Sequence, residues 1–139
     1  MGIPRYVDVN VFVYWLGGHP LFGSRAYEWI RKVEKAKRGE YVTSTLTVYE
    51  VLVIIAGLTG RSLSDRGFVE RIVEAIRGLR GLMLTSLGEE TLTEASITMD
   101  RYGIDYEDAL HLAVALKAGA KEIISDDEDF DRTPLKRLF

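Results

Sequence analysis

The chain has 139 residues, a length typical of one folded domain, and its lack of cysteine excludes a disulfide scaffold or a thiolate metal site. The formal net charge of −3 divides into +4 over residues 1–80 (12 Lys/Arg, 8 Asp/Glu) and −7 over residues 81–139 (6 Lys/Arg, 13 Asp/Glu). This asymmetry fits a polyanion held near an acidic site, although charge alone fits two differently solvated faces better.

The longest strictly apolar run, residues 51–56, is too short to span a bilayer, and residues 1–6 lack the apolar core of a signal peptide. We therefore expect one cytoplasmic domain over residues 1–139 that does not contact a membrane. The absence of cysteine agrees weakly with a reducing compartment.

The first part of the chain predicts a buried strand that ends at Asp8, with Asn10 two residues later. Apolar residues at helical spacing then predict a helix from near residue 22 to Gly39, with Lys and Arg on its other face. Residues 42–44 predict a second strand. An acid at the end of a buried strand either caps the following helix or lies in a site at that edge.

The middle of the chain predicts two helices, which are followed by a third strand. Thr47 and Glu50 have capping-box spacing and predict that a helix begins there and ends near Gly57 or Gly60. Because this helix is apolar on all sides, we expect it to be buried on more than one side. Residues 62–78 predict an amphipathic helix, and residues 82–84 predict a third strand.

The last part of the chain predicts two helices and a fourth strand. The spacing of Ser86 and Glu89 predicts a capping box that opens a helix ending at Gly103. Asp105 caps the next helix, and Gly119 ends it. Residues 122–125 predict the fourth strand, which the acidic run 126–131 follows.

Alternating strands and helices predict an α/β protein, with a mainly parallel sheet of four to five strands in a three-layer α/β/α sandwich. The carboxyl ends of parallel strands share one edge, so Asp8 and Asp127 are expected together there. Glu50 and Asp108, in the first turns of two helices, are expected at the same edge. Either residue alone is equally well explained as a helix cap.

Four close carboxylates cannot all remain ionised without a cation. Because these ligands are oxygens and no cysteine is available, they favour Mg²⁺ or Mn²⁺ over zinc. His111, one turn after Asp108, and His19, in a predicted loop, are more simply explained as structural residues than as ligands.

These residues together resemble the PIN-domain nucleases, and most of all the small VapC-type toxins. Asp8-Val9-Asn10 resembles the family's Asp-Thr/Ser-Asn, and Glu50 follows a short polar stretch as in the family. Asp108 opens an alanine-rich helix, and residues 125–130 resemble Thr/Ser-x-Asp-x-Asp-Phe. The resemblance spans nearly the whole chain, and Val9 departs from it by lacking a hydroxyl.

The resemblance implies a PIN-like fold and Mg²⁺- or Mn²⁺-dependent hydrolysis of RNA by Asp8, Glu50, Asp108 and Asp127. Further acids and polar residues are candidates for supporting contacts: Asn10, Ser125, Asp126 and Asp129. It also implies an antitoxin protein as partner. Other interpretations are a stand-alone PIN nuclease of RNA processing and a catalytically silent binding module.

Two other classes of protein, one of enzymes and one of signalling domains, also have an Asp after the first strand. A haloacid-dehalogenase-like phosphotransferase needs a second carboxylate where Asn10 stands, and a response-regulator receiver needs a Lys where Asp127 and Glu128 stand. Both classes are therefore disfavoured by the sequence.

The apolar helix after Glu50 also predicts self-association, because a surface helix requires a polar face. The small toxins that the chain resembles usually form dimers. A two-fold homodimer and coverage by the helix of residues 62–78 explain the pattern equally well.

Overall fold

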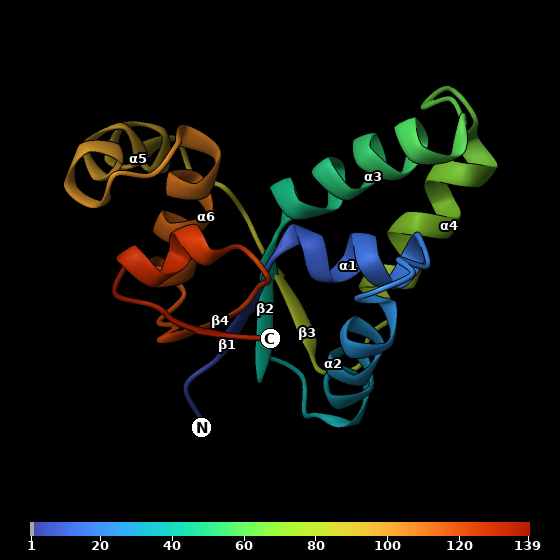
Figure 1. The fold of residues 1–139 in the computed structure, drawn as a ribbon, viewed down its shortest axis with the longest axis horizontal. Helices are drawn as coiled ribbons and strands as arrows, with labels where there is room; N and C mark the ends of the chain where they lie inside the picture. Colours follow the sequence, from blue (N-terminus) through green and yellow to red (C-terminus); the bar gives the residue numbers. More distant parts are fainter. Residues whose placement is uncertain (1) are drawn as a thin grey trace.

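The computed structural model describes residues 2–139, in which a five-stranded sheet lies between helices (Figure 1). In chain order the elements are β1 (Arg5–Val7), α1 (Val9–Leu16), α2 (Gly23–Lys35), β2 (Tyr41–Ser44), α3 (Thr45–Thr59), α4 (Arg66–Arg77), β3 (Leu82–Thr85), α5 (Glu89–Tyr102), α6 (Tyr106–Lys117), β4 (Glu122–Ile124), the 3₁₀ helix η1 (Glu128–Arg132) and β5 (Lys136–Leu138). The predicted α/β/α fold with a parallel sheet is confirmed.

All strand pairs in the sheet are parallel, and the strand order is β3-β2-β1-β4-β5. The first strand is therefore central, and Tyr6 pairs with Val42 on one side and with Ile123 on the other. The chain builds the sheet outward from β1 in one direction, and then returns to add β4 and β5 in the other. Ligands of open α/β sheets bind where the strand order reverses in this way, outside the carboxyl ends of the strands.

Helices α1 to α4 cover one face of the sheet, and α5 and α6 cover the other (Figure 1). The period of two along a strand separates the side chains between these layers. Val7 and Ile124 belong to the core with α1–α4, whereas Tyr6 and Ile123 belong to the core with α5 and α6. The tyrosine of the central strand thus faces α6.

Two predicted capping boxes are wrong. The Ser44 hydroxyl accepts a hydrogen bond from the backbone N–H of Leu46, so α3 begins at Thr45 and Glu50 lies in its second turn. The Thr47 side chain is buried instead, and its hydroxyl lies 2.9 Å from that of Thr43. Helix α5 begins after Gly88 without a side-chain cap, so Ser86 does not cap it.

Three other helix ends can be compared with their predictions. The predicted cap of α6 is confirmed, since Asp105 Oδ1 accepts from the N–H of Asp108, and Gly119 follows with a φ of 85°. Helix α2 ends earlier than predicted, at Lys35 rather than Gly39. The backbone of Gly81 approaches the end of α2, where its N–H donates to the carbonyl of Val33. A Cβ at residue 81 would lie only 2.4 Å from that carbonyl oxygen.

Helix α3 is buried on one side only, which differs from the sequence expectation. Val51 and Ile55 are buried, but Leu58 is 68% exposed and Val53 and Ile54 are exposed too. Helix α4 covers part of α3 and leaves this apolar side open. Within residues 2–139, none of the helices combines the length and the apolarity needed to cross a bilayer.

Candidate active site

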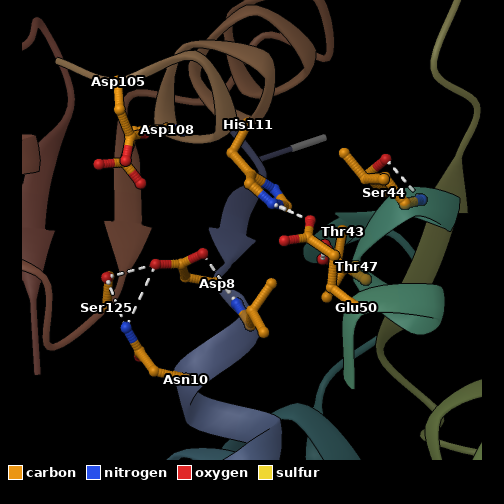
Figure 2. A network of polar contacts seen from close by, with 12 residues as sticks. Asp8, Asn10, Thr43, Ser44, Thr47, Glu50, Asp105, Asp108, His111 and Ser125 are labelled. Carbon is orange, nitrogen blue, oxygen red and sulfur yellow. Dashed lines mark hydrogen bonds and ion pairs between the residues drawn. The ribbon is translucent and has the colours of Figure 1, made fainter. Parts of the chain in front are cut away.

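Asp8 lies at the carboxyl end of the central strand and is almost completely buried, with 6% exposed. Its Oδ1 accepts from the backbone N–H of Val9 at 2.8 Å, which makes it the N-cap of α1. Its Oδ2 accepts from the hydroxyl of Ser125 at 2.6 Å and from the amide of Asn10 at 3.3 Å (Figure 2). Burial raises the pKa of Asp8, although the charge of His111 and the hydrogen bonds from Ser125 and the Val9 backbone oppose the rise. Asp8 is thus both a helix cap and a carboxylate held in a fixed orientation.

Ser125 joins the exit of β4 to the exit of β1. Its buried hydroxyl donates to Asp8 and accepts from the backbone N–H of Asp127 at 3.0 Å and from the Asn10 amide at 3.2 Å. Asn10 in turn accepts from the backbone N–H of Asp126 at 3.2 Å. Both polar residues therefore contact Asp8 and the acidic run together, and the valine at position 9 leaves this network intact.

Asp108 gathers with Asp127 and Asp129 at the same edge of the sheet. One carboxylate oxygen from each of the three lies within 4.8 Å of those of the other two. Burial, followed by the charges of Asp127, Asp105, Asp8 and Asp129, raises the pKa of Asp108 to about 7. Such repulsion is relieved when a cation binds, so this cluster is suited to a metal ion.

Glu50 approaches from α3 and meets His111 of α6, and the Glu50 Oε1 to His111 Nε2 distance is 2.6 Å (Figure 2). Glu107 is close by, and these three residues form a second group with atoms within 4.8 Å of one another. Burial and the charge of Glu50 raise the pKa of Glu107 to about 7. Burial lowers the pKa of His111, but contacts with Tyr6 and Glu50 and the charge of Asp8 raise it by more than burial lowers it. The pKa of His111 therefore lies well above its ordinary value.

The four carboxylates predicted from the sequence come from four separate segments and lie in two groups near the end of β1. Asp108 and Asp127 share one cluster, whereas Glu50 lies with Glu107 and His111. In Figure 2, Asp8 lies between Asp108 and Glu50. Asp127 shares Ser125 with Asp8 and shares the acidic cluster with Asp108. The donor atoms are carboxylate oxygens with one imidazole nearby, which fits Mg²⁺ or Mn²⁺ better than a soft metal.

Asp126 and Asp127 differ in their surroundings. The Tyr14 hydroxyl donates to Asp126 Oδ2 at 2.9 Å, and burial, followed by this hydrogen bond, raises the pKa of Tyr14 to about 12. Asp127 and Asp129 instead face Asp108. The four candidate supporting residues therefore differ in place. Asn10 and Ser125 lie beside Asp8, Asp129 lies in the cluster with Asp108, and Asp126 contacts Tyr14 of α1.

His111 and Tyr6 contribute contacts that were not predicted from the sequence. The sequence signal for His111 was its place one turn after Asp108, but an apolar helix around it favoured a structural explanation. For Tyr6 the sequence gives no signal, since its partner lies 105 positions away.

Comparisons with known proteins agree on the fold. A family model described as "PIN domain" matches residues 5–136. No curated protein sequence matches the chain. The fold is similar to that of VapC20 from Mycobacterium tuberculosis, described as a toxin that cleaves the sarcin-ricin loop, with a TM-score of 0.72 and 15% identity over 91% of this chain and 92% of that one.

Two further solved structures show the same fold. A toxin-antitoxin complex from Klebsiella pneumoniae has a TM-score of 0.67 and 17% identity, over 95% of this chain and 98% of that chain. VapBC2 from Rickettsia felis, bound to a DNA fragment from its promoter, has a TM-score of 0.67 and 14% identity, over 96% of each chain.

Proposed function

The chain belongs to the PIN-domain family, whose model covers residues 5–136, and from this premise we propose that it is a metal-dependent endoribonuclease. The observation that carries the proposal is the acidic cluster with Asp108 and Asp127, which Ser125 connects to the buried Asp8 at the carboxyl end of β1. Glu50 lies on the other side of Asp8 (Figure 2). In this proposal these four carboxylates bind Mg²⁺ or Mn²⁺. They come from distant segments, and burial, followed by repulsion from neighbouring acids that include Asp127 and Asp8, raises the pKa of Asp108 to about 7.

The chain's own residues would prepare the site before a phosphate arrives. A bound divalent cation would polarise the phosphate and lower the pKa of an attacking water. Ser125 and Asn10 hold the Asp8 carboxylate in one orientation by two hydrogen bonds, so little reorganisation is needed when it binds a cation. Asp108 lies in the first turn of α6, where the helix dipole offsets part of its negative charge.

A path of positive and aromatic side chains leads away from the acids. The Arg25 guanidinium lies 5.5 Å from the centre of the Phe139 ring, which contacts Tyr14, and the Tyr14 hydroxyl binds Asp126. Cations in such a place favour a polyanion such as RNA by contacts to its backbone, and this attraction weakens as salt is added.

We further propose that the enzyme is the toxin of a toxin-antitoxin pair. Two proteins with the same fold are described as members of such complexes, and the open apolar side of α3 offers a surface for a second protein or a second copy. A stand-alone nuclease of RNA processing would have the same site. A silent binding module is disfavoured because all four acids are present.

The test uses single-stranded RNA with Mg²⁺ or Mn²⁺, and compares the wild type with a variant carrying Asp8→Asn and Asp108→Asn. We expect internal cleavage by the wild type, loss of cleavage in EDTA, and no cleavage by the variant. Calorimetry should show metal binding that this variant loses. A control with Glu94→Gln and Asp100→Asn removes two exposed acids of α5 and should keep both properties. Full cleavage in excess EDTA, or unchanged metal binding by the Asp8 and Asp108 variant, would contradict the proposal.

A further inference from the structure

His111 is a buried polar residue whose two ring nitrogens both have partners. The side chain is 1% exposed and lies on α6, one turn after Asp108. Its Nε2 lies 2.6 Å from Glu50 Oε1, and its Nδ1 lies 2.7 Å from the Tyr6 hydroxyl. The ring therefore connects α6 to both α3 and the central strand.

Besides Tyr6 and Glu50, the carboxylate of Glu107 lies near His111. The neighbouring α6 residues Leu110, Leu112 and Ala113 are buried as well. A buried imidazole destabilises the fold unless its nitrogens are hydrogen-bonded, and here both nitrogens have partners. Packing alone does not explain a histidine here, but its contact with Glu50 does.

Tyr6 fixes the far side of the imidazole. It lies on the central strand with 0% exposed, and its hydroxyl is also 3.4 Å from Thr47 Oγ1. The hydroxyl of Thr43 is 2.9 Å from that of Thr47 and donates to the carbonyl of Val7 at 2.7 Å. The ring is thereby anchored to the backbone of β1, the central strand of the sheet.

Glu50 needs such an anchor more than the other three acids do. Asp8 and Asp127 are short side chains held by hydrogen bonds at strand ends, and Asp108 lies in a capped first turn. Glu50 has one more rotatable bond and projects from the second turn of α3, a helix with an open outer side. The Glu50 side chain has several rotamers, and its carboxylate points steadily toward the other acids only when a contact selects one of them.

We propose that His111, held by Tyr6, is a positioning residue that fixes the Glu50 carboxylate in the orientation in which it binds the metal ion. This inference rests on the proposed function, in which Glu50 is a ligand. Partners of metal ligands act in this way by orienting the ligand, and their loss lowers metal affinity or activity about 10- to 100-fold. His111 itself does not bind the ion in this arrangement, because Nε2 is directed at Glu50 and Nδ1 at Tyr6.

The experiment measures Mn²⁺ affinity by electron paramagnetic resonance and the kcat and KM of RNA cleavage for three variants of the full chain. His111→Leu keeps the volume but removes both contacts, and we expect a roughly 100-fold weaker Mn²⁺ affinity with a lower kcat and little change in KM. His111→Gln retains an amide donor for Glu50 and should recover part of the loss. Tyr6→Phe removes only the anchor, and we expect a loss near the lower limit of about 10-fold.

Two control variants separate positioning from general loss of stability. Tyr41→Phe removes the hydroxyl of another buried tyrosine, at the opposite end of the sheet, and Val114→Ala weakens packing one turn further along α6. Both should keep the Mn²⁺ affinity of the wild type, even where they lower the melting temperature. Should His111→Leu fail to fold, Tyr6→Phe and His111→Gln carry the test.

Three outcomes are distinguishable. The inference would be overturned if His111→Leu folds and keeps the wild-type Mn²⁺ affinity and kcat. If His111→Leu does not fold, the same result for Tyr6→Phe would overturn it. A directly bonded nitrogen in the Mn²⁺ spectrum, absent from His111→Gln, would overturn it too by making His111 a ligand. A wild-type protein that neither binds Mn²⁺ nor cleaves RNA would instead refute the proposed function on which the inference rests.

Discussion

Replacing Asp108 by Asn should make the metal-free protein more stable above neutral pH while abolishing activity. Asp108 is buried, its carboxylate accepts no hydrogen bond from residues 2–139 that would hold it in the charged form, and it is close enough to Asp8, Asp127 and Asp129 to be repelled by their charges. Asparagine has the same shape without the charge. The backbone hydrogen bond from residue 108 to the Asp105 cap is unaffected by this change.

The magnitude follows from the pKa of Asp108, which is about 7 in the folded chain and 3.8 ordinarily. Because the folded value is the higher one, the folded protein binds an extra proton between these two pH values. Each rise in pH through that window therefore lowers the free energy of unfolding, and above pH 7 the loss is complete. At ~1.4 kcal/mol for each pKa unit, the unscreened loss is about 4 kcal/mol. Asp127 and Asp129 are partly exposed, so solvent screening reduces the expected loss to roughly 2 kcal/mol.

Urea denaturation in EDTA measures this difference. We expect Asp108→Asn to raise the free energy of unfolding by roughly 2 kcal/mol at pH 8 and by less than half of that at pH 5, where most Asp108 in the folded wild type is protonated. Saturating Mn²⁺ should reduce or reverse the advantage, since it stabilises only the wild type. Asp100→Asn, at an exposed position, is the control and should change little. An equal gain at both pH values, or no gain at pH 8, would refute the reasoning about charge repulsion.

The remaining predictions concern the acidic run and the assembly. Asp127→Ala should lose far more RNA cleavage than Asp126→Ala, because Asp127 faces Asp108 while Asp126 is tied to Tyr14; the reverse order in a cleavage assay would place the wrong acid in the site. The exposed side of α3 should pair two copies of the chain, and light scattering at micromolar concentration should give the mass of a dimer that Leu58→Glu reduces to that of a monomer. A monomer mass for the wild type over the accessible range would contradict this.

The positions of β1 to β4 were predictable because each is a short run with apolar residues beside a polar or acidic residue, whereas β5, with the sequence Lys136-Arg137-Leu138, has no such pattern and was not predicted. Asp8 and Ser125 mark two such ends, and once the sheet is parallel their meeting follows. The cap of α6 was predictable for a similar local reason, since Asp105 and Gly119 are suited to the two ends of a helix. These signals depend on near neighbours in the sequence alone.

The start of α3 was not predictable in the same way, because Ser44 and Thr47 both satisfy the local rules for a cap. The hydroxyl of Thr43, on the preceding strand, holds Thr47 in the core, and Ser44 is left to cap the helix. This shift places Glu50 in the second turn, where it meets His111. The contact between these two residues depends on helix packing across 61 positions, which no local pattern records.

The strand order has a consequence for a chain that is still being synthesised. The backbone N–H of Asp8 donates to the carbonyl of Ile124 at 3.0 Å, and its side chain accepts from Ser125, 117 positions later. A ribosome makes β1 first, but β1 cannot acquire its neighbour β4 until almost 120 further residues have emerged. Asp108 emerges shortly before β4, and Asp127 shortly after it. A nascent chain therefore lacks the complete acidic cluster until residue 127 is free to fold, and under the proposed function it cannot cut the messenger from which it is translated before then.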